Sequence, residues 1–444
     1  MEETLLQMLD ARENRVWKQT ELLSRFRKPL ICFTMNIAGP EKNNPLITEG
    51  FRMGQAQIEA QLAGLPVLHR EEVLADTGCE GYYVVDADTA PLKALMAEIE
   101  DASPVGRLFD LDVLDLQGKK VCREALGLPG RKCLICGNPV YLCSSRRSHS
   151  VEALQDKTRQ LLLDALRHRD ALTLGALAVQ SLLYEVSVTP KPGLVDRENS
   201  GSHRDMDFFS FLRSSAVLEP YFTQFARIGM DTAHLPPEET FRRLRFPGKQ
   251  AEQAMFRATG GVNTHKGAIF TLGLLCAAAG RLEKRLRNPE RICLECASMT
   301  KGIVSRELGC VTPENAATNG QMLYAKYGIK GIRGQAEGGF PAVLDSGLPA
   351  LKKALEAGLS INDAACAALL YLIRDTQDTN LITRSDPDRW KSTVAGITAL
   401  LETTPLPTGD QLRALDREFI RENLSPGGSA DLLAASLFLL YLGE

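Results

Sequence analysis

The chain has 444 residues, of which 44% are hydrophobic and 24% are charged, and its formal net charge is −3 at pH 7. This composition is typical of a globular protein, and the length indicates two or perhaps three domains. A slightly acidic chain has no general electrostatic attraction for nucleic acid or for an anionic membrane, so we expect neither as a partner.

The first residues are acidic and then amphipathic, without the basic and apolar regions of a secretory signal. The longest apolar runs, 268–279 and 432–442, are shorter than the roughly 20 residues that span a bilayer. These features predict a cytoplasmic protein. Its eleven cysteines are therefore expected to be reduced thiols or metal ligands.

The first third of the chain mixes helix and strand signals. Residues 3–26 have helical periodicity, whereas 29–35, 82–85 and 107–116 have the composition or the alternation of strands. From about residue 152 onward, helical segments follow one another, separated by polar loops with Gly and Pro. The expected helices are 152–168, 171–186, 206–218, 266–281, 288–303, 313–326, 361–374, 388–402, 409–421 and 429–442.

The change of pattern predicts two domains of different class. We expect an α+β domain over residues 1–165 and an all-α domain over residues 166–444, with a charged helix near 150–170 as the connector.

Two aspartates in the third expected strand are candidates for catalysis and for metal binding. Asp110 and Asp112 are two residues apart, so both point to one face of the strand, and their neighbours are apolar. Paired carboxylates suit Mg²⁺, which assists phosphoryl or nucleotidyl transfer, and Arg107 just before them is a candidate phosphate ligand. The alternative is an edge strand with a hydrated acidic face, and the short motif leaves both open.

A cysteine-rich segment follows. Cys133 and Cys136 have the spacing of a metal knuckle, and Cys143 and His149 stand at distances that would complete a tetrahedral zinc site. The second pair of ligands is loosely spaced and Cys122 competes with it, which favours packed thiols over zinc.

Several segments of this first domain resemble a known family: DARENR, TMNIAGPEKN, SPVGRLFDLDVLD and LGLPGRKCLICGNPVYLCSSRRSHS. They are similar to the enzyme that attaches the prosthetic group to the acyl carrier (gamma) subunit of citrate lyase. The resemblance implies transfer of phosphoribosyl-dephospho-CoA from its triphosphate precursor to a carrier serine, with release of pyrophosphate. It also implies a nucleotidyltransferase-like fold, in which Asp110 and Asp112 match the metal-binding pair of related enzymes.

Five polar islands interrupt the helical domain, and the first is the most charged. Residues 184–207 combine acidic and basic side chains with Pro and Gly: Glu185, Lys191, Asp196, Arg197, His203, Arg204, Asp205 and Asp207. A solvated helix face would not carry so much Pro and Gly. This pattern favours a loop that holds a highly charged ligand with the help of a metal ion.

The second island, GGVNTHKG at 260–267, stands just before an apolar helix. Its Asn263 and Lys266, together with free amides at a helix start, predict a phosphate site. His265 is a candidate catalytic residue here, with a satisfied core histidine as the alternative.

Each of the other three islands has a structural alternative. Arg333 in 328–341 is a candidate phosphate ligand or part of a surface ion pair, and Asp378 in 374–384 is a magnesium ligand or a turn cap. Asp431 in 423–431 binds metal or stabilises a helix start. Because five islands occur in one domain, we expect the loops at one end to converge on a single site.

The islands resemble triphosphoribosyl-dephospho-CoA synthase of the citrate lyase system, over about residues 170–444. The resemblance implies that ATP loses adenine and that the ribose 2′-hydroxyl of 3′-dephospho-CoA takes its place. It also implies Mg²⁺, with Glu185, Asp205, Asp207 and His265 in metal or catalytic roles. The basic and amide ligands of the phosphates would be Lys191, Arg197, Asn263, Lys266, Arg333 and Arg384, and the magnesium ligands Glu185, Asp378 and Asp431. One motif departs from the family, since Ser385 and Asp386 replace two expected glycines after Arg384.

The sequence thus predicts a bifunctional transferase that makes and installs the citrate lyase prosthetic group. A nucleotidyltransferase fused to a non-catalytic, ATP-binding regulatory module is the alternative.

Overall fold

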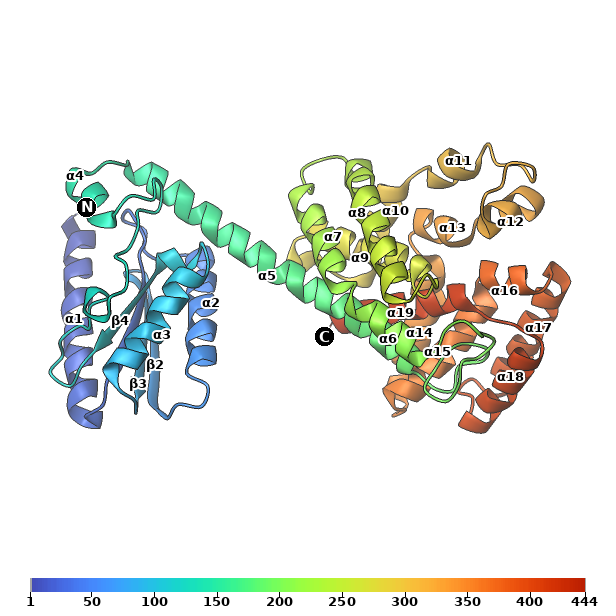
Figure 1. Cartoon of the computed structure of the whole chain (residues 1–444), viewed down its shortest axis with the longest axis horizontal. Coiled ribbons are helices and arrows are strands. Elements are labelled where there is room, and N and C mark those ends of the chain that lie inside the picture. The colour runs from blue at the N-terminus through green and yellow to red at the C-terminus, as the bar shows by residue number, and fades with distance from the viewer. Residues whose placement is uncertain (1, 444) are drawn as a thin grey trace. The chain divides into compact units, whose positions relative to one another are not determined.

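The computed structural model describes residues 2–443 and divides into two compact units between His168 and Arg169. The division falls beside the expected boundary at 165–166. Helix α5 (Val151–Ser187) runs through it as one helix of 37 residues, where the sequence predicted two helices (Figure 1). Among the described residues, none of the helices has the length and hydropathy that crossing a membrane requires.

The first unit is an α+β domain. Its strands are β1 (Leu30–Met35), β2 (Val67–Ala75), β3 (Gly78–Val85) and β4 (Phe109–Leu114), which form an antiparallel sheet in the order β2-β3-β1-β4. The helices are α1 (Glu2–Phe26), α2 (Pro45–Gln61), α3 (Thr89–Ala102), α4 (Val140–Arg146) and the first part of α5, with short 3₁₀ turns at Gly106–Leu108 and Glu124–Leu126.

Each face of this sheet has its own apolar cluster. On one face Phe33 and Phe109 pack against Phe51 of α2 and Met96 of α3. On the other face Leu22 and Leu23 of α1 pack against Tyr82 and Leu114. The sheet is therefore covered by helices on both sides, with β4 as one edge (Figure 1).

The sequence analysis missed strand β2. Its side chains are mostly exposed or half-buried, and His69, Arg70, Glu71 and Glu72 lie at its centre. An edge strand with charged side chains avoids aggregation, but it lacks the apolar alternation by which a strand is recognised.

The second unit is all-helical. After α5 it contains α6 (Phe208–Ala216), α7 (Glu219–Asp231), α8 (Pro237–Ala258), α9 (Lys266–Arg281), α10 (Pro289–Thr300), α11 (Ile303–Leu308), α12 (Asn319–Tyr327), α13 (Gly331–Glu337), α14 (Leu348–Glu356), α15 (Ile361–Asp375), α16 (Thr379–Arg384), α17 (Pro387–Thr403), α18 (Gly409–Arg421) and α19 (Gly427–Leu442), with a 3₁₀ turn at Lys284–Leu286 and a π turn at Val343–Gly347. The all-α prediction is confirmed.

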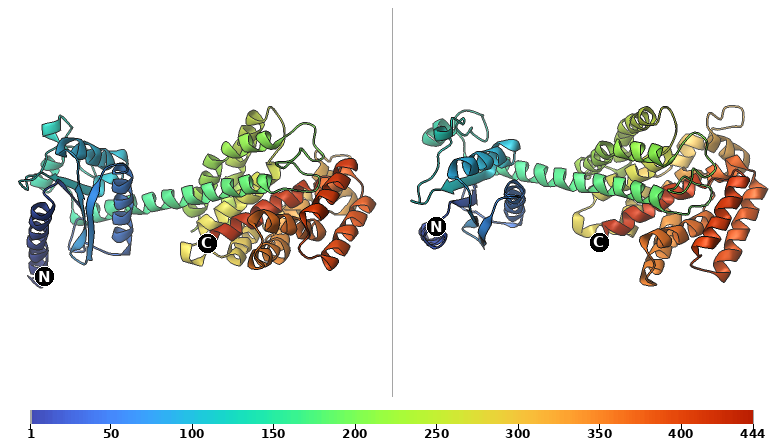
Figure 2. Two further views of the ribbon diagram at one scale, coloured as in Figure 1. Left: turned by 90° about the horizontal axis from the view of Figure 1, so that it is seen from below. Right: turned by 60° about the horizontal axis from the view of Figure 1, so that its bottom comes forward.

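The core of this unit is built around α9, α15 and α19, which are buried on nearly all sides. The red C-terminal helix α19 lies among the other helices in both views of Figure 2. Helices that are apolar all round belong in a protein interior. Their N-terminal ends carry His265, Lys266 and Asp431, so the core helices position polar groups directly.

Candidate active sites and a candidate metal centre

A cavity of about 270 Å³ in the helical domain is lined by residues from four of the five polar islands. The expected convergence is therefore correct for four islands and wrong for the fifth, 328–341. The predicted site residues that line the cavity are Glu185, Lys191, Asp205, Asn263, His265, Lys266, Arg384 and Asp431.

The loop between α5 and α6 is folded around a buried carboxylate. Asp196 accepts hydrogen bonds from the backbone amides of Lys191, Glu198 and Asn199 at 2.7–3.0 Å. From outside the loop, Asp416 of α18 accepts from the amide of Gly193 at 2.9 Å. These contacts fix the backbone that presents Lys191 to the cavity.

Lys191 and Glu185 form a buried ion pair at the cavity. The Lys191 ammonium donates a hydrogen bond to Glu185 Oε1, and the two residues are 1% and 5% exposed. Burial raises the pKa of the Glu185 carboxyl, and the Lys191 charge opposes that rise. Lys191 is thus committed to Glu185 in this conformation.

Asp431 lies just after the first turn of α19, against the start of α9. A Cβ atom placed on Gly267 would be 1.9 Å from Asp431 Oδ2, so only glycine allows this close approach. No basic side chain within residues 2–443 forms a salt bridge with Asp431. Burial raises its pKa well above the ordinary value, and the nearby carboxylates of Glu185 and Asp378 add to the effect. Without a cation the neutral form of Asp431 is therefore favoured, and a bound cation would stabilise its ionised form.

His265 is buried at the N-terminal end of α9. Its Nδ1 is 2.7 Å from Ser214 Oγ, which accepts a hydrogen bond from Thr264 Oγ1 at 2.8 Å. Its Nε2 has no hydrogen-bond partner among the described residues. Burial lowers the pKa of His265 to about 3, so the imidazole is neutral at physiological pH with one nitrogen uncommitted.

His203 connects two islands at the rim of the same cavity. Arg384 donates to His203 Nδ1 at 3.0 Å, and His203 Nε2 is 2.9 Å from Ser425 Oγ. Burial, followed by the Arg384 charge, lowers the pKa of His203 from 6.5 to about 4. Arg384 also donates to the Ser202 carbonyl at 2.7 Å.

We expect acid to destabilise the protein partly through His203. Above about pH 6.5 the group is neutral in both states. Between about pH 6.5 and about pH 4 the unfolded chain binds a proton that the folded protein does not, so stability falls. Unfolding in denaturant across this pH range should show the parent losing stability relative to His203→Gln. Parallel pH profiles of the two proteins would contradict this assignment.

Four predicted site residues do not line this cavity. Asp207 caps α6 through Ser210, and Arg197 is exposed and bonded to Thr189 and Asn362. Asp378 caps α16, and its two oxygens accept four hydrogen bonds, from the amides of 380, 381 and 429 and the hydroxyl of 429. These interactions are structural, so we leave all three residues out of the ligand set below.

The fourth, Arg333, lies in helix α13 and not in the expected loop. It donates to Glu307 at 2.7 Å and lines a second cavity of about 330 Å³. Phe241 and Phe270 give this cavity an apolar wall, and Lys266 lines both cavities. The fifth island therefore belongs to an adjoining cavity.

In the α+β domain, Asp110 and Asp112 lie on one face of the edge strand β4, as predicted. Asp110 is 3.0 Å from Arg131, and Asp112 accepts a hydrogen bond from Lys120. Both carboxylates are partly exposed. The structure also has the geometry of the alternative, an edge strand with a hydrated acidic face, because β4 is at the edge of the sheet.

Beside this pair, a cavity of about 490 Å³ has a strongly basic lining. Its charged residues are Arg107, Arg131, Lys132 and Arg147, and none of the described residues that line it is acidic. Arg131 therefore connects the basic cavity to Asp110. Such a lining suits a polyphosphate.

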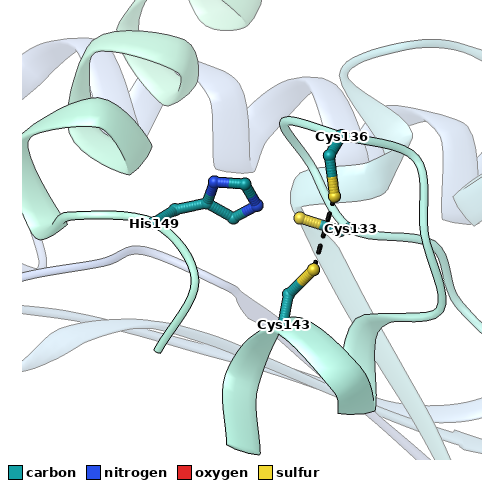
Figure 3. Close-up of side chains that lie close together, drawn as sticks. All are labelled: Cys133, Cys136, Cys143 and His149. Carbon is teal, nitrogen blue, oxygen red and sulfur yellow. Dashed lines mark hydrogen bonds between the residues drawn. The ribbon is translucent and has the colours of Figure 1, made fainter. Parts of the chain in front are cut away.

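The cysteine segment forms a compact cluster. One ligand atom from each of Cys133, Cys136, Cys143 and His149 lies within 4.8 Å of all the others, and Figure 3 shows the imidazole pointing toward the three sulfur atoms. The backbone amide of Asn138 and the nearby Cys143 lower the pKa of Cys136 to about 6. Cys122 is exposed and bonds only weakly to a backbone carbonyl.

Two family models match the chain. Residues 3–165 match apo-citrate lyase phosphoribosyl-dephospho-CoA transferase, and residues 171–444 match ATP:dephospho-CoA triphosphoribosyl transferase. The chain belongs to the citrate lyase prosthetic-group transferases. It combines both of their activities, so the prediction of a bifunctional transferase is confirmed.

Two relatives are similar to this chain over nearly its whole length, and a third is similar over part of it. Protein CitXG of Haemophilus influenzae is 35% identical over 98% of this chain and 95% of its own length. Protein CitXG of Leuconostoc mesenteroides subsp. cremoris is 34% identical over 99% of this chain and 97% of its own length. A probable 2-(5''-triphosphoribosyl)-3'-dephosphocoenzyme-A synthase of Albidiferax ferrireducens is 44% identical over 61% of this chain and 91% of that protein.

The sequence analysis missed several residues that build the sites of this transferase. Ser214 lies on α6 and meets His265 only in the folded chain. Lys120 and Arg131 lie outside β4 and pair with its two aspartates only in the folded chain. Asn380 and Ser425 also line the cavity, and their places in the islands 374–384 and 423–431 did point to the site.

Proposed function

We propose that the cavity at the ends of α9 and α19 is where the adenine of ATP is exchanged for the 2′-hydroxyl of 3′-dephospho-CoA. We further propose that the α+β domain then transfers phosphoribosyl-dephospho-CoA to a serine of the citrate lyase acyl carrier subunit and releases pyrophosphate. The observation that carries the first assignment is the convergence of four polar islands on one cavity with buried carboxylates.

Breaking the N-glycosidic bond of ATP develops positive charge on the ribose. Glycosidases stabilise such a charge with a carboxylate. Glu185, Asp205 and Asp431 line the cavity and supply negative charge there. Asp205 is the exposed member of the three, so it is the one we assign to the ribose.

The attacking 2′-hydroxyl must lose a proton. His265 is neutral, its Nδ1 is fixed by Ser214, and its Nε2 is uncommitted. We assign Nε2 as the atom that accepts this proton. The fixed orientation of the ring reduces the cost of placing the base.

The triphosphate needs cationic and amide ligands. Lys266 and the side-chain amide of Asn263 lie at the start of α9 and are suited to phosphate, and Arg384 lines the same cavity. Magnesium fits the donor set, because Asp431 and Glu185 are buried carboxylates with raised pKa values. These two would hold Mg²⁺, which when bound neutralises phosphate charge.

The reaction requires two nucleotides, and the domain has two adjoining cavities. Lys266 lines both of them, and the second has apolar walls from Phe241 and Phe270 with Arg245 and Arg333 beside them. We assign the second cavity to dephospho-CoA, whose pantetheine arm is weakly polar and whose phosphates are anionic.

For the α+β domain we propose a nucleotidyltransferase-like fold with Asp110 and Asp112 as magnesium ligands. Two carboxylates on one strand face support this assignment. In the present conformation Lys120 and Arg131 supply the positive charge beside them that Mg²⁺ would supply when bound. The adjacent basic cavity, with Arg107 in its wall, would hold the phosphates.

A labelling experiment tests this function. ATP carrying ¹⁴C in adenine is incubated with the protein, Mg²⁺ and either dephospho-CoA or its 2′-deoxy analogue. We expect labelled free adenine with dephospho-CoA only, followed by a mass increase of added apo carrier protein. ATP binding without adenine release would favour the regulatory-module alternative and contradict the proposal.

A further inference from the structure

The Cys133–His149 segment has the side chains of a tetrahedral metal centre already gathered. They come from one turn (Cys133 and Cys136), from helix α4 (Cys143) and from the second residue before α5 (His149). Cys136 Sγ and Cys143 Sγ are 3.3 Å apart. The His149 Nε2 is buried and has no hydrogen-bond partner among the described residues.

The spacing of these atoms is that of a zinc site. With Zn–S near 2.3 Å and Zn–N near 2.0–2.1 Å, the ligand atoms of a tetrahedral centre are about 3.5–3.8 Å apart. The four atoms here are all within 4.8 Å of one another. Only a small movement would therefore bring all four onto one ion.

The backbone of the knuckle is also formed. The amide of Cys133 donates to the Asn138 carbonyl at 2.6 Å, and the Gly137 amide donates to the Cys133 carbonyl at 3.2 Å. Gly137 has φ of 73°, a left-handed conformation that glycine adopts without strain. This turn points Cys133 and Cys136 to the same side (Figure 3).

The segment has almost no apolar core of its own. From residue 115 to residue 150, Arg123 and Cys133 are the two buried residues. A stretch of this kind cannot be held by hydrophobic burial, and small structural units in this position commonly depend on a metal ion. The cluster joins the turn at 133–138, helix α4 and the residues before α5.

We propose that Cys133, Cys136, Cys143 and His149 bind a structural Zn²⁺ ion that fixes the wall of the basic cavity in the α+β domain. Arg107 donates to the backbone carbonyls of Lys132 and Cys133, and Arg131 bonds to Asp110 and to the Phe109 carbonyl at 3.0 and 2.6 Å. The knuckle is thereby attached to the start of β4. Ordering it places the two arginines beside the acidic pair.

The charge balance of this centre agrees with its surroundings. In the bound state three thiolates, one neutral imidazole and Zn²⁺ leave a net charge of −1, and the cysteines that are still protonated release their protons on binding. Arg107, Arg131, Lys132 and Arg147 line the cavity beside the cluster. Zinc binding requires no redox change.

Metal analysis of the full chain tests this proposal. We expect one zinc per chain by elemental mass spectrometry, and its loss in Cys136→Ser and Cys143→Ser. Cys122→Ser is the matched control, because Cys122 is a neighbouring exposed cysteine outside the cluster, and it should retain the ion. Absence of zinc from the reduced parent after incubation with zinc chloride would overturn the proposal, as would a Cys136–Cys143 disulfide in protein purified in the presence of a thiol reductant.

Cobalt substitution covers the case in which the serine variants do not fold. Co²⁺ added to the chelator-treated parent should give the thiolate charge-transfer absorption and the intense visible bands of a tetrahedral site, and Zn²⁺ should displace it. An octahedral cobalt spectrum would overturn the assignment.

The effect on activity rests on the function proposed for the α+β domain. Removal of zinc should lower carrier modification by about 10- to 100-fold, measured with purified triphosphate precursor, and leave adenine release unchanged. If zinc were lost without any change in carrier modification, the metal site would be supported but its role at the cavity would be rejected. Failure of the parent itself to modify the carrier would instead reject the proposed function.

Discussion

Replacing Asp431 by asparagine is expected to lower adenine release by about 100- to 1000-fold, the size of effect seen when a key electrostatic group is removed from an active site. Asparagine has nearly the same shape, so the close contact with Gly267 is preserved and the fold should be kept. The loss would come from the missing charge. Initial rates of ¹⁴C-adenine formation, with circular dichroism as the folding check, measure this effect.

The matched control is Asp410→Asn. Asp410 is also near the start of a helix, α18, but its side chain is fully exposed. It should have the parent's rate. If Asp431→Asn kept more than about one tenth of the parent's activity, a difference below about 1.4 kcal/mol in barrier height, Asp431 would have no direct part in the reaction.

The second large effect separates the two activities. The double variant Asp110→Asn, Asp112→Asn should stop carrier modification and leave adenine release at the parent's rate, because the two aspartates lie in the α+β unit and the adenine cavity lies in the helical unit. Loss of two metal-binding carboxylates removes the charge that we assign to holding Mg²⁺. Carrier mass and adenine release are measured in the same reaction mixture.

Asp88→Asn is the control for this pair. Asp88 is an exposed residue before α3 whose side chain makes no capping hydrogen bond, so both activities should be retained. Normal carrier modification by the double variant would remove the acidic pair from the mechanism. Loss of both activities would instead mean that the two halves are coupled through Asp110 and Asp112.

The class of each domain and most of the long helices of the helical domain could be predicted, because hydrophobic periodicity over 10 or more residues is a strong signal. Helices α9, α15 and α19 were found in this way. Helix α8 was missed because Pro247 lies inside it, and proline usually interrupts a helix.

The candidate sites could be predicted only in outline. Polar islands among apolar helices identified Glu185, His265 and Asp431 as neighbours of one cavity. Burying a polar group without a partner costs free energy, so polar groups at the ends of buried helices indicate a binding site. Their separate roles depend on contacts between distant parts of the chain, such as Ser214 with His265. A sequence read locally gives no indication of such contacts.

Some capping residues resembled catalytic residues for the same reason. Asp207 and Asp378 have the residue type and loop position of metal ligands, but each satisfies amides at the start of a helix. Helix caps and metal sites both select short carboxylates. Only the count of hydrogen bonds that each oxygen accepts distinguishes the two uses.

A crystal structure with ATP and Mg²⁺, without dephospho-CoA, tests the central claim most directly. The account predicts triphosphate density beside Lys266 and Asn263 at the start of α9, with the metal ion between Asp431 and Glu185 and the ribose within reach of Asp205. ATP bound at any other surface of the helical domain, with this cavity filled by water alone, would contradict it.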